Sequence, residues 1–150
     1  MRDPKQVYET LSDEGEFQEC SFDKDEVAKI ADLAFKSYEY GKRLRKDSKA
    51  DWRVIFNIHY DALRELCSAL MRFKEQKISN HQGLFAFIVL NFPKFGFDWG
   101  FFEEIRSYRN KSKYMGVDIQ KEQWKGIELQ VDLYISALNE EIQKRLGELK

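Results

Sequence analysis

Apolar residues recur at every third or fourth position along most of the chain, which is the spacing of one face of an α-helix. The clearest stripe predicts a helix from about Trp52 to Lys74. Its members are Trp52, Ile55, Phe56, His59, Leu63, Leu66, Cys67, Leu70 and Phe73. Similar stripes predict a helix from about Asp25 to Arg45 and a last helix from about Gln120 to Leu149. No segment shows the sustained period-two alternation of a strand.

Residues typical of helix ends place two further helices. The stretch "DPKQVYETLSDEG" predicts a short first helix, with Pro4 near its start and Gly15 beyond its end. In "ISNHQGLFAFIVLNFP", Ser79 and Gln82 have the spacing of a capping box. The helix that follows them is apolar on nearly every side, so we expect it to be buried among its neighbours.

A fifth predicted helix starts near Asp98 and stops at Gly116. Short connections between successive helices favour antiparallel packing. The sequence therefore predicts an all-α, antiparallel bundle of five or six helices. We expect a single domain over residues 1–150, in which 1–22 form a short N-terminal helix and loop and 23–148 form the bundle.

Composition narrows the function classes. The formal net charge is −1, so any affinity for phosphate groups must come from a local patch. Cys20 and Cys67 are too few and too far apart for a disulfide framework or a metal knuckle, and Cys67 is expected to be a small core residue. No Gly-rich phosphate loop or Glu-x-x-His pair occurs, so no cofactor or metal is predicted. Without a signal peptide or a run of ~18 apolar residues, we expect a cytoplasmic protein with no membrane contact.

The stretch "EEIRSYRNKSKYMG", residues 103–116, combines cations with two tyrosines. Its basic residues are Arg106, Arg109, Lys111 and Lys113. Arg109 lies one turn beyond Ile105 on the predicted buried face, where an unpaired guanidinium is costly. Two interpretations stay open. Arg109 forms a structural ion pair among cations that complement the helix C-terminus, or it forms an anion site together with a second surface.

Other polar residues have simpler interpretations. The basic run "KRLRKDSKAD" follows a predicted helix, where cations favour the negative end of the helix dipole. His59 lies on the apolar stripe of its helix and is expected to be a hydrogen-bonded core histidine. His81, in the first turn of the fourth helix, is expected to be exposed or capping. The loop "NFPKFGFDWGFF" either tucks under the bundle or forms part of a subunit interface.

The motif "RNKSKY" at the end of a bundle helix resembles the signature of HEPN domains, the helical domains of prokaryotic toxin–antitoxin pairs and related nucleases. That signature is an Arg, a polar residue that is often Asn, and a His after four to six intervening positions. "HYDALRELCSALMRFKEQKISNHQGLFAFI" is similar to the long helix, short turn and following helix of the family. The resemblance covers residues 23–148. Arg109 takes the place of the Arg, Asn110 the polar position and Tyr114 the first permitted place of the His.

The resemblance implies metal-independent RNA cleavage by two motifs that face each other across a homodimer. Arg109, Asn110 and Tyr114 would then act on RNA, and Arg106, Arg109 and Lys113 would bind its phosphates. Tyr, with a pKa near 10, is a poorer base at neutral pH than His near 6.5. We therefore expect an RNA- or nucleotide-binding domain or an atypical ribonuclease toxin component.

Two alternatives stay open. One is a non-catalytic interaction module that partners a small nucleotidyltransferase antitoxin, in which Tyr114 or Tyr108 would be modified. The other is a plain helical scaffold whose cations lie only at the surface.

Overall fold

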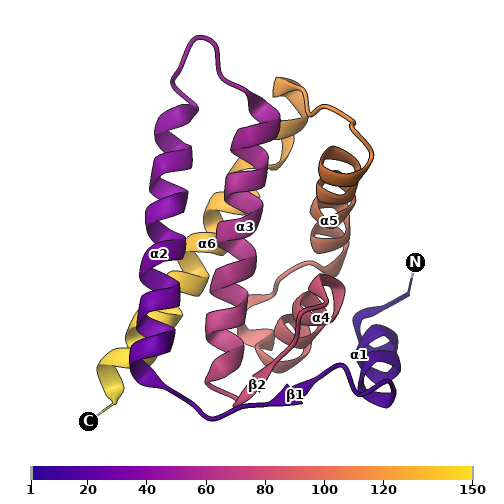
Figure 1. The fold of residues 1–150 in the computed structure, drawn as a ribbon, viewed down its shortest axis with the longest axis vertical. Coiled ribbons are helices and arrows are strands. Elements are labelled where there is room, and N and C mark those ends of the chain that lie inside the picture. Colours follow the sequence, from indigo (N-terminus) through magenta and orange to yellow (C-terminus); the bar gives the residue numbers. More distant parts are fainter. Residues whose placement is uncertain (1, 150) are drawn as a thin grey trace.

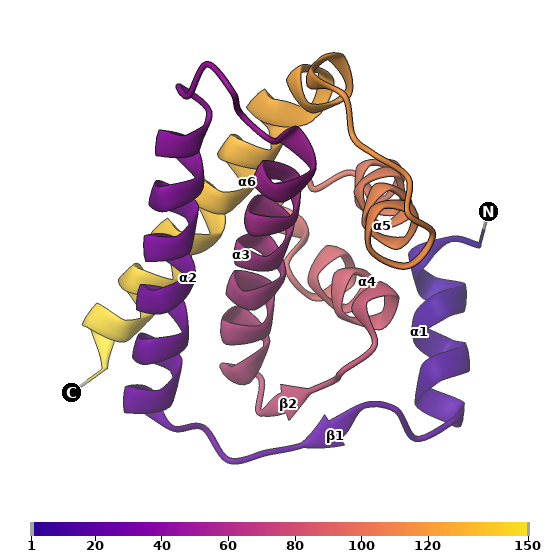
Figure 2. The same cartoon turned by 45° about the horizontal axis from the view of Figure 1, so that its top comes forward.

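A long helix, α3 (Trp52–Arg72), stands in the middle of the computed structural model, which describes residues 2–149 (Figure 1). The other helices are α1 (Pro4–Asp13), α2 (Lys24–Leu44), α4 (His81–Asn91), α5 (Trp99–Tyr114) and α6 (Lys121–Glu148). α2 runs antiparallel to α3, and α6 crosses behind both (Figures 1 and 2). α4 and α5 cover the other side of α3, and α1 packs on α4. The prediction of an all-α bundle of five or six helices is confirmed over the described residues, which form six.

Most helices begin at an aspartate whose carboxylate accepts a backbone N–H of the first turn. These residues are Asp3, Asp23, Asp51 and Asp98. For α4 the predicted cap was wrong. Asn80, not Ser79, caps the helix by accepting the N–H of Gly83 at 2.9 Å. Gln82 is not part of a capping box, because its amide donates to Glu103 on α5 at 3.1 Å.

The apolar helix α4 is buried, as its composition predicts. Residues 83–88 are buried, and Phe85 stacks on Phe102 of α5 at 4.5 Å between ring centroids. The aromatic loop after it, which contains the 3-10 turn η1 (Pro93–Phe95), folds under the bundle. There Phe97 stacks on Tyr134 of α6 at 4.1 Å. Of the two expectations for this loop, the structure shows the first.

A two-stranded sheet joins distant parts of the chain. β1 (Gln18–Glu19) pairs antiparallel with β2 (Gln76–Lys77), which links the α1–α2 connection to the turn after α3. The Cys20 N–H extends the pairing by donating to the carbonyl of Glu75 at 3.0 Å. Strands of two residues are too short to show an alternating pattern, so the sequence did not predict them.

Two further features of the fold bear on the sequence predictions. Cys67 is fully buried in α3, which confirms its predicted role as a small core residue. No helix within residues 2–149 combines the length and the apolar character needed to cross a membrane.

Arg45 ties α2, α3 and α6 together through a buried polar network. Its guanidinium donates to both carboxylate oxygens of Asp132, at 2.6 and 3.0 Å, and to Nε2 of His59 at 2.7 Å. His59 therefore carries its proton on Nδ1, which donates to the carbonyl of Ile55 at 2.7 Å. The Tyr38 hydroxyl also donates to Asp132, at 2.9 Å. His59 is thus a hydrogen-bonded core histidine, as predicted. Arg45 lies at the C-terminal cap of α2, where the sequence placed the basic run, and in addition pairs with Asp132.

Gly41 lets α2 approach the His59 ring. A Cβ atom at this position would lie 2.7 Å from Cε1 of His59 and 3.0 Å from Cγ2 of Ile58. Such distances are shorter than van der Waals contact, so a larger residue would displace the imidazole from the Arg45 guanidinium. By contrast, a Cβ atom at the exposed Gly126 of α6 would meet no atom within 4 Å.

We therefore expect Gly41→Ala and Gly126→Ala to change the free energy of unfolding in opposite directions. Gly41→Ala should destabilise the protein by about 1–3 kcal/mol because it overpacks the interface beside His59. Gly126→Ala should stabilise it by about 0.5–1 kcal/mol, since alanine loses less backbone entropy in a helix. Urea denaturation of both variants measures the two values. An unchanged stability for Gly41→Ala would contradict the tight approach of α2 and α3.

Candidate functional site

Positive charge is concentrated at one end of the molecule, the upper end in Figure 1. Residues 42–53 and 110–125 contain ten Lys and Arg against four Asp and Glu, a formal charge of +6. The first stretch covers the end of α2, its loop and the start of α3. The second covers the end of α5, its loop and the start of α6. We call these two stretches together the basic end; the rest of the chain carries a formal charge of −7.

Direct contacts join the two stretches. The Trp52 ring, at the start of α3, lies 5.9 Å from Nζ of Lys121 and 5.8 Å from Nζ of Lys125. Four residues beyond the first stretch, the Asn57 amide of α3 donates to the Ser112 hydroxyl of α5 at 3.3 Å. The basic end is therefore one continuous region although its two stretches are far apart in the sequence.

Most cations of the basic end are available to a ligand. Arg45 and Lys125 form ion pairs with Asp132 and Glu128, at 2.6 and 3.3 Å. The other eight are exposed and have no carboxylate within 4 Å among residues 2–149. They are Lys42, Arg43, Lys46, Lys49, Arg53, Lys111, Lys113 and Lys121. Unpaired surface cations at this density favour a polyanionic partner.

Hollows and aromatic rings accompany these cations. A hollow of about 300 Å³ at the end of α2 is lined by Glu39, Lys42, Arg43, Arg45 and Lys46. Two tyrosine rings project into solvent beside the cations: Tyr40 is 51% exposed and Tyr114 is 72% exposed. Exposed rings next to unpaired cations are typical of surfaces on which single-stranded nucleic acid stacks.

Arg109, the central residue of the predicted site, is buried rather than free. Only 5% of it is exposed, and its Nη2 lies 3.0 Å from Oδ1 of Asp61 on α3. Its Nη1 donates to Oδ1 of Asn57 at 2.9 Å, and the guanidinium lies over the Tyr60 ring at 5.1 Å. The structural ion pair, one of the two interpretations of this residue, is therefore present. The guanidinium left free for a phosphate, which the other interpretation requires, is not found within residues 2–149.

The remaining predicted site residues do not converge on Arg109. Asn110 and Tyr114 lie on the solvent-facing side of α5, turned away from the buried guanidinium. Arg106 is partly buried and paired with Glu103, donating to its two carboxylate oxygens at 3.1 and 3.2 Å. Of the predicted phosphate-binding residues, Lys113 alone is exposed and unpaired within residues 2–149.

His81 packs beside the Arg109 cluster. It is half-buried, and its Nδ1 lies 2.9 Å from the Tyr60 hydroxyl, so it is neither exposed nor a cap as expected. Burial lowers the pKa of His81 to about 4, helped by the positive charges of Arg64 and Arg109. Burial, with the nearby Arg45, likewise lowers the pKa of His59 to about 4. Both imidazoles are therefore neutral at pH 7.

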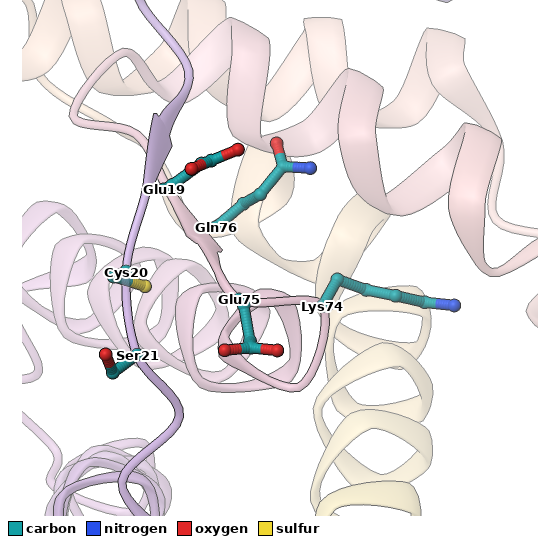
Figure 3. Close-up of a pocket in the computed structure, with 6 residues that line it drawn as sticks. All are labelled: Glu19, Cys20, Ser21, Lys74, Glu75 and Gln76. Atoms are coloured by element: carbon teal, nitrogen blue, oxygen red, sulfur yellow. The ribbon is translucent and has the colours of Figure 1, made fainter.

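Two larger hollows lie outside the basic end. The groove between α2 and α3, of about 530 Å³, contains the carboxylates of Asp61 and Glu65 and so does not extend the basic end. A polar hollow of about 490 Å³ lies at the opposite end, beside β1 and the turn after α3 (Figure 3). There the Lys74 side chain points away from the Cys20 thiol. Residues 2–149 contain no group of three potential metal ligands.

The sequence pattern did not identify the cations at the end of α2 and the start of α3 as candidate ligand-binding residues. Each run follows or precedes a helix terminus, where charge complements the helix dipole, so neither indicates a ligand by itself. Their proximity to Lys111, Lys113 and Lys121 is a product of the fold.

Comparisons with known proteins identify no relative. No protein-family model matches the chain, and no match is found among curated proteins or solved structures. The resemblance to HEPN domains stays a prediction that rests on the sequence motifs.

We expect Arg109→Ala to lower the free energy of unfolding by about 2–3 kcal/mol. The substitution removes the donor of the Asn57 amide oxygen and the nearer of two cations beside Asp61, which keeps only Arg64, at 3.8 Å. Lys113→Ala, one turn along the same helix but exposed, should change stability by less than about 0.5 kcal/mol. Urea denaturation of both variants measures the difference. Equal stability of Arg109→Ala and wild type would show that the ion pair has no structural role.

We also expect stability to fall as the pH falls from about 6.5 to about 4. Both histidines have a folded-state pKa of about 4, below the unfolded value near 6.5, so in this window the unfolded chain binds protons that the folded chain does not. Each histidine should contribute a slope of about 1 kcal/mol per pH unit. The pKa values of Asp132 and Glu141 are lowered, so these carboxylates begin to lose their stabilisation only near the acid end of that window, whereas the raised pKa of Glu65 acts in the opposite sense.

The measurement is the free energy of unfolding at a series of pH values, for wild type and His81→Gln. The variant should show about half of the wild-type slope between pH 6.5 and 4 because one of the two histidines is absent. A variant whose slope equals that of wild type would contradict the burial of His81.

Proposed function

We propose that this protein is a non-catalytic domain that binds single-stranded RNA through its basic end. The observation that supports the proposal is the set of eight exposed, unpaired cations gathered on a chain of net charge −1. Neutralising RNA phosphates with such cations releases condensed counterions, which drives binding. Because the charge is local, the affinity is expected at this end and not over the rest of the surface.

The exposed rings of Tyr40 and Tyr114 favour a single strand over a duplex. In a duplex the bases are stacked on one another, whereas an unpaired base offers its face to an aromatic side chain. The Arg43 guanidinium lies over the Tyr40 ring, 5.5 Å from its centroid, and Lys113 precedes Tyr114 in α5. Each ring therefore has a cation near it that can bind the phosphate next to a stacked base.

Binding is favoured over cleavage by the state of the potential catalytic groups. Arg109 is held by Asp61 and Asn57 and cannot reach a phosphate without leaving them. A phenol, the group at position 114, is in general a poorer proton acceptor for catalysis than the imidazole of the HEPN signature. In terms of the HEPN resemblance, we propose a member that has kept an RNA-binding surface without the nuclease chemistry.

A second candidate is docking to a partner protein, such as the nucleotidyltransferase that the resemblance implies. Its support is a pair of exposed apolar side chains within the basic end, where Met115 is 69% exposed and Val117 is also exposed. Exposed apolar residues next to each other favour protein contacts. This candidate and the first differ in whether the isolated protein binds RNA.

The test is fluorescence anisotropy of labelled single-stranded RNA, titrated with wild type and two double variants over a range of salt concentrations. Lys111→Ala/Lys113→Ala should weaken binding and reduce the slope of log K against log[salt] by roughly 0.7 for each phosphate that the variant no longer neutralises. The matched control, Lys24→Ala/Lys29→Ala, removes two exposed cations from the start of α2, away from the basic end, and should leave the slope unchanged.

Two outcomes would overturn the proposal. Equally weakened binding in both double variants would mean that the affinity follows net charge and not the basic end. No binding by wild type at about 50 mM salt, where phosphate contacts are strongest, would exclude RNA and favour the second candidate.

A further inference from the structure

A small hollow lies within the basic end, at the corner where α5 leads into α6. Its volume is about 110 Å³. The lining residues are Tyr108, Lys111, Val117, Asp118, Ile119 and Gln123. A water molecule occupies about 30 Å³ in the liquid, so the hollow has room for roughly three or four waters or one flat ring system.

The turn after α5 builds the walls of this hollow. α5 ends at Tyr114, and Gly116 takes a left-handed conformation with φ of 65°, which lets the chain reverse. The N–H of Val117 then donates to the carbonyl of Lys111 at 3.1 Å. Val117 and the buried Ile119 thereby provide apolar walls beside α5 and the first turn of α6.

The polar groups of the hollow are held in place and leave bonding capacity for a ligand. Oδ1 of Asp118 accepts the N–H of Ile119 at 2.9 Å, and its other carboxylate oxygen forms no hydrogen bond with residues 2–149. Oε1 of Gln123 accepts the N–H of Gln120 at 2.8 Å, so its amide N–H groups stay free to donate. Lys111 adds a second donor. The residues that border this mostly apolar hollow therefore include one carboxylate acceptor and two donors.

We infer that this hollow binds one guanine base of the RNA. The Watson–Crick edge of guanine carries two adjacent donor groups, N1–H and the 2-amino group, followed by the acceptor O6. Asp118 would accept from the donors, and Lys111 or Gln123 would donate to O6. Adenine, cytosine and uracil each carry a single donor group on that edge, so they match the carboxylate less well. The inference rests on the proposed RNA binding and adds base selectivity to it.

The experiment compares three labelled oligonucleotides, 5′-UUUUUGUUUUU, 5′-UUUUUAUUUUU and all-U of the same length, by fluorescence anisotropy. Wild type should bind the guanine oligonucleotide roughly tenfold more tightly than the other two, the scale of a bidentate contact to a base. Asp118→Asn should remove this preference, because a neutral amide has a single acceptor oxygen, while all-U binding is kept or strengthened. Circular dichroism checks that the variant remains helical.

The matched control is Glu122→Gln, which removes one negative charge from the same end but does not line the hollow. It should strengthen binding of all three oligonucleotides and keep the guanine preference. Equal affinities of wild type for the three, an equal preference for adenine, or a guanine preference that persists in Asp118→Asn would overturn the inference while RNA binding stands. Failure of wild type to bind any of them at about 50 mM salt would overturn the proposed function and this inference with it.

Discussion

The Arg45 guanidinium holds three helices together at the end of the molecule where positive charge is greatest. Its bonds to Asp132 and His59 place a carboxylate and a neutral imidazole beneath a surface with a formal charge of +6. Cations gathered this closely repel one another, and the carboxylate offsets part of that repulsion. The basic end therefore depends on a partly buried ion pair that joins the end of α2 to α3 and α6, more than on any one of its surface lysines.

Helix positions could be predicted because the signals that set them are local. The apolar stripe of α3 and the aspartates at the helix starts act over a few residues, so the predicted helices match those of the structure to within a few residues at each end. The cap of α4 was assigned wrongly because Ser79 and Asn80 are neighbours with similar capping ability. A capping box with Ser79 requires the Gln82 side chain to bond back to the start of the helix. In the structure that side chain donates instead to Glu103, which is on another helix.

The candidate site was less predictable because its contacts are not local. Spacing from Ile105 placed Arg109 on the buried face, but no pattern could show that Asp61 would meet it there. The basic end likewise depends on residues that are far apart in the sequence. It is assembled from two stretches, each of which has the ordinary charge of a helix terminus, and their sum appears only once α3 and α6 bring them together.

The uneven distribution of charge gives the molecule a large electric dipole, because a body of formal charge −7 stands behind an end of +6. In the field of a polyanion such a molecule rotates before contact, so productive encounters are more frequent than the pI of about 6.2 would indicate. The same asymmetry limits crowding. Copies bound side by side on one strand would turn their acidic bodies toward one another, and mutual repulsion would space them along it.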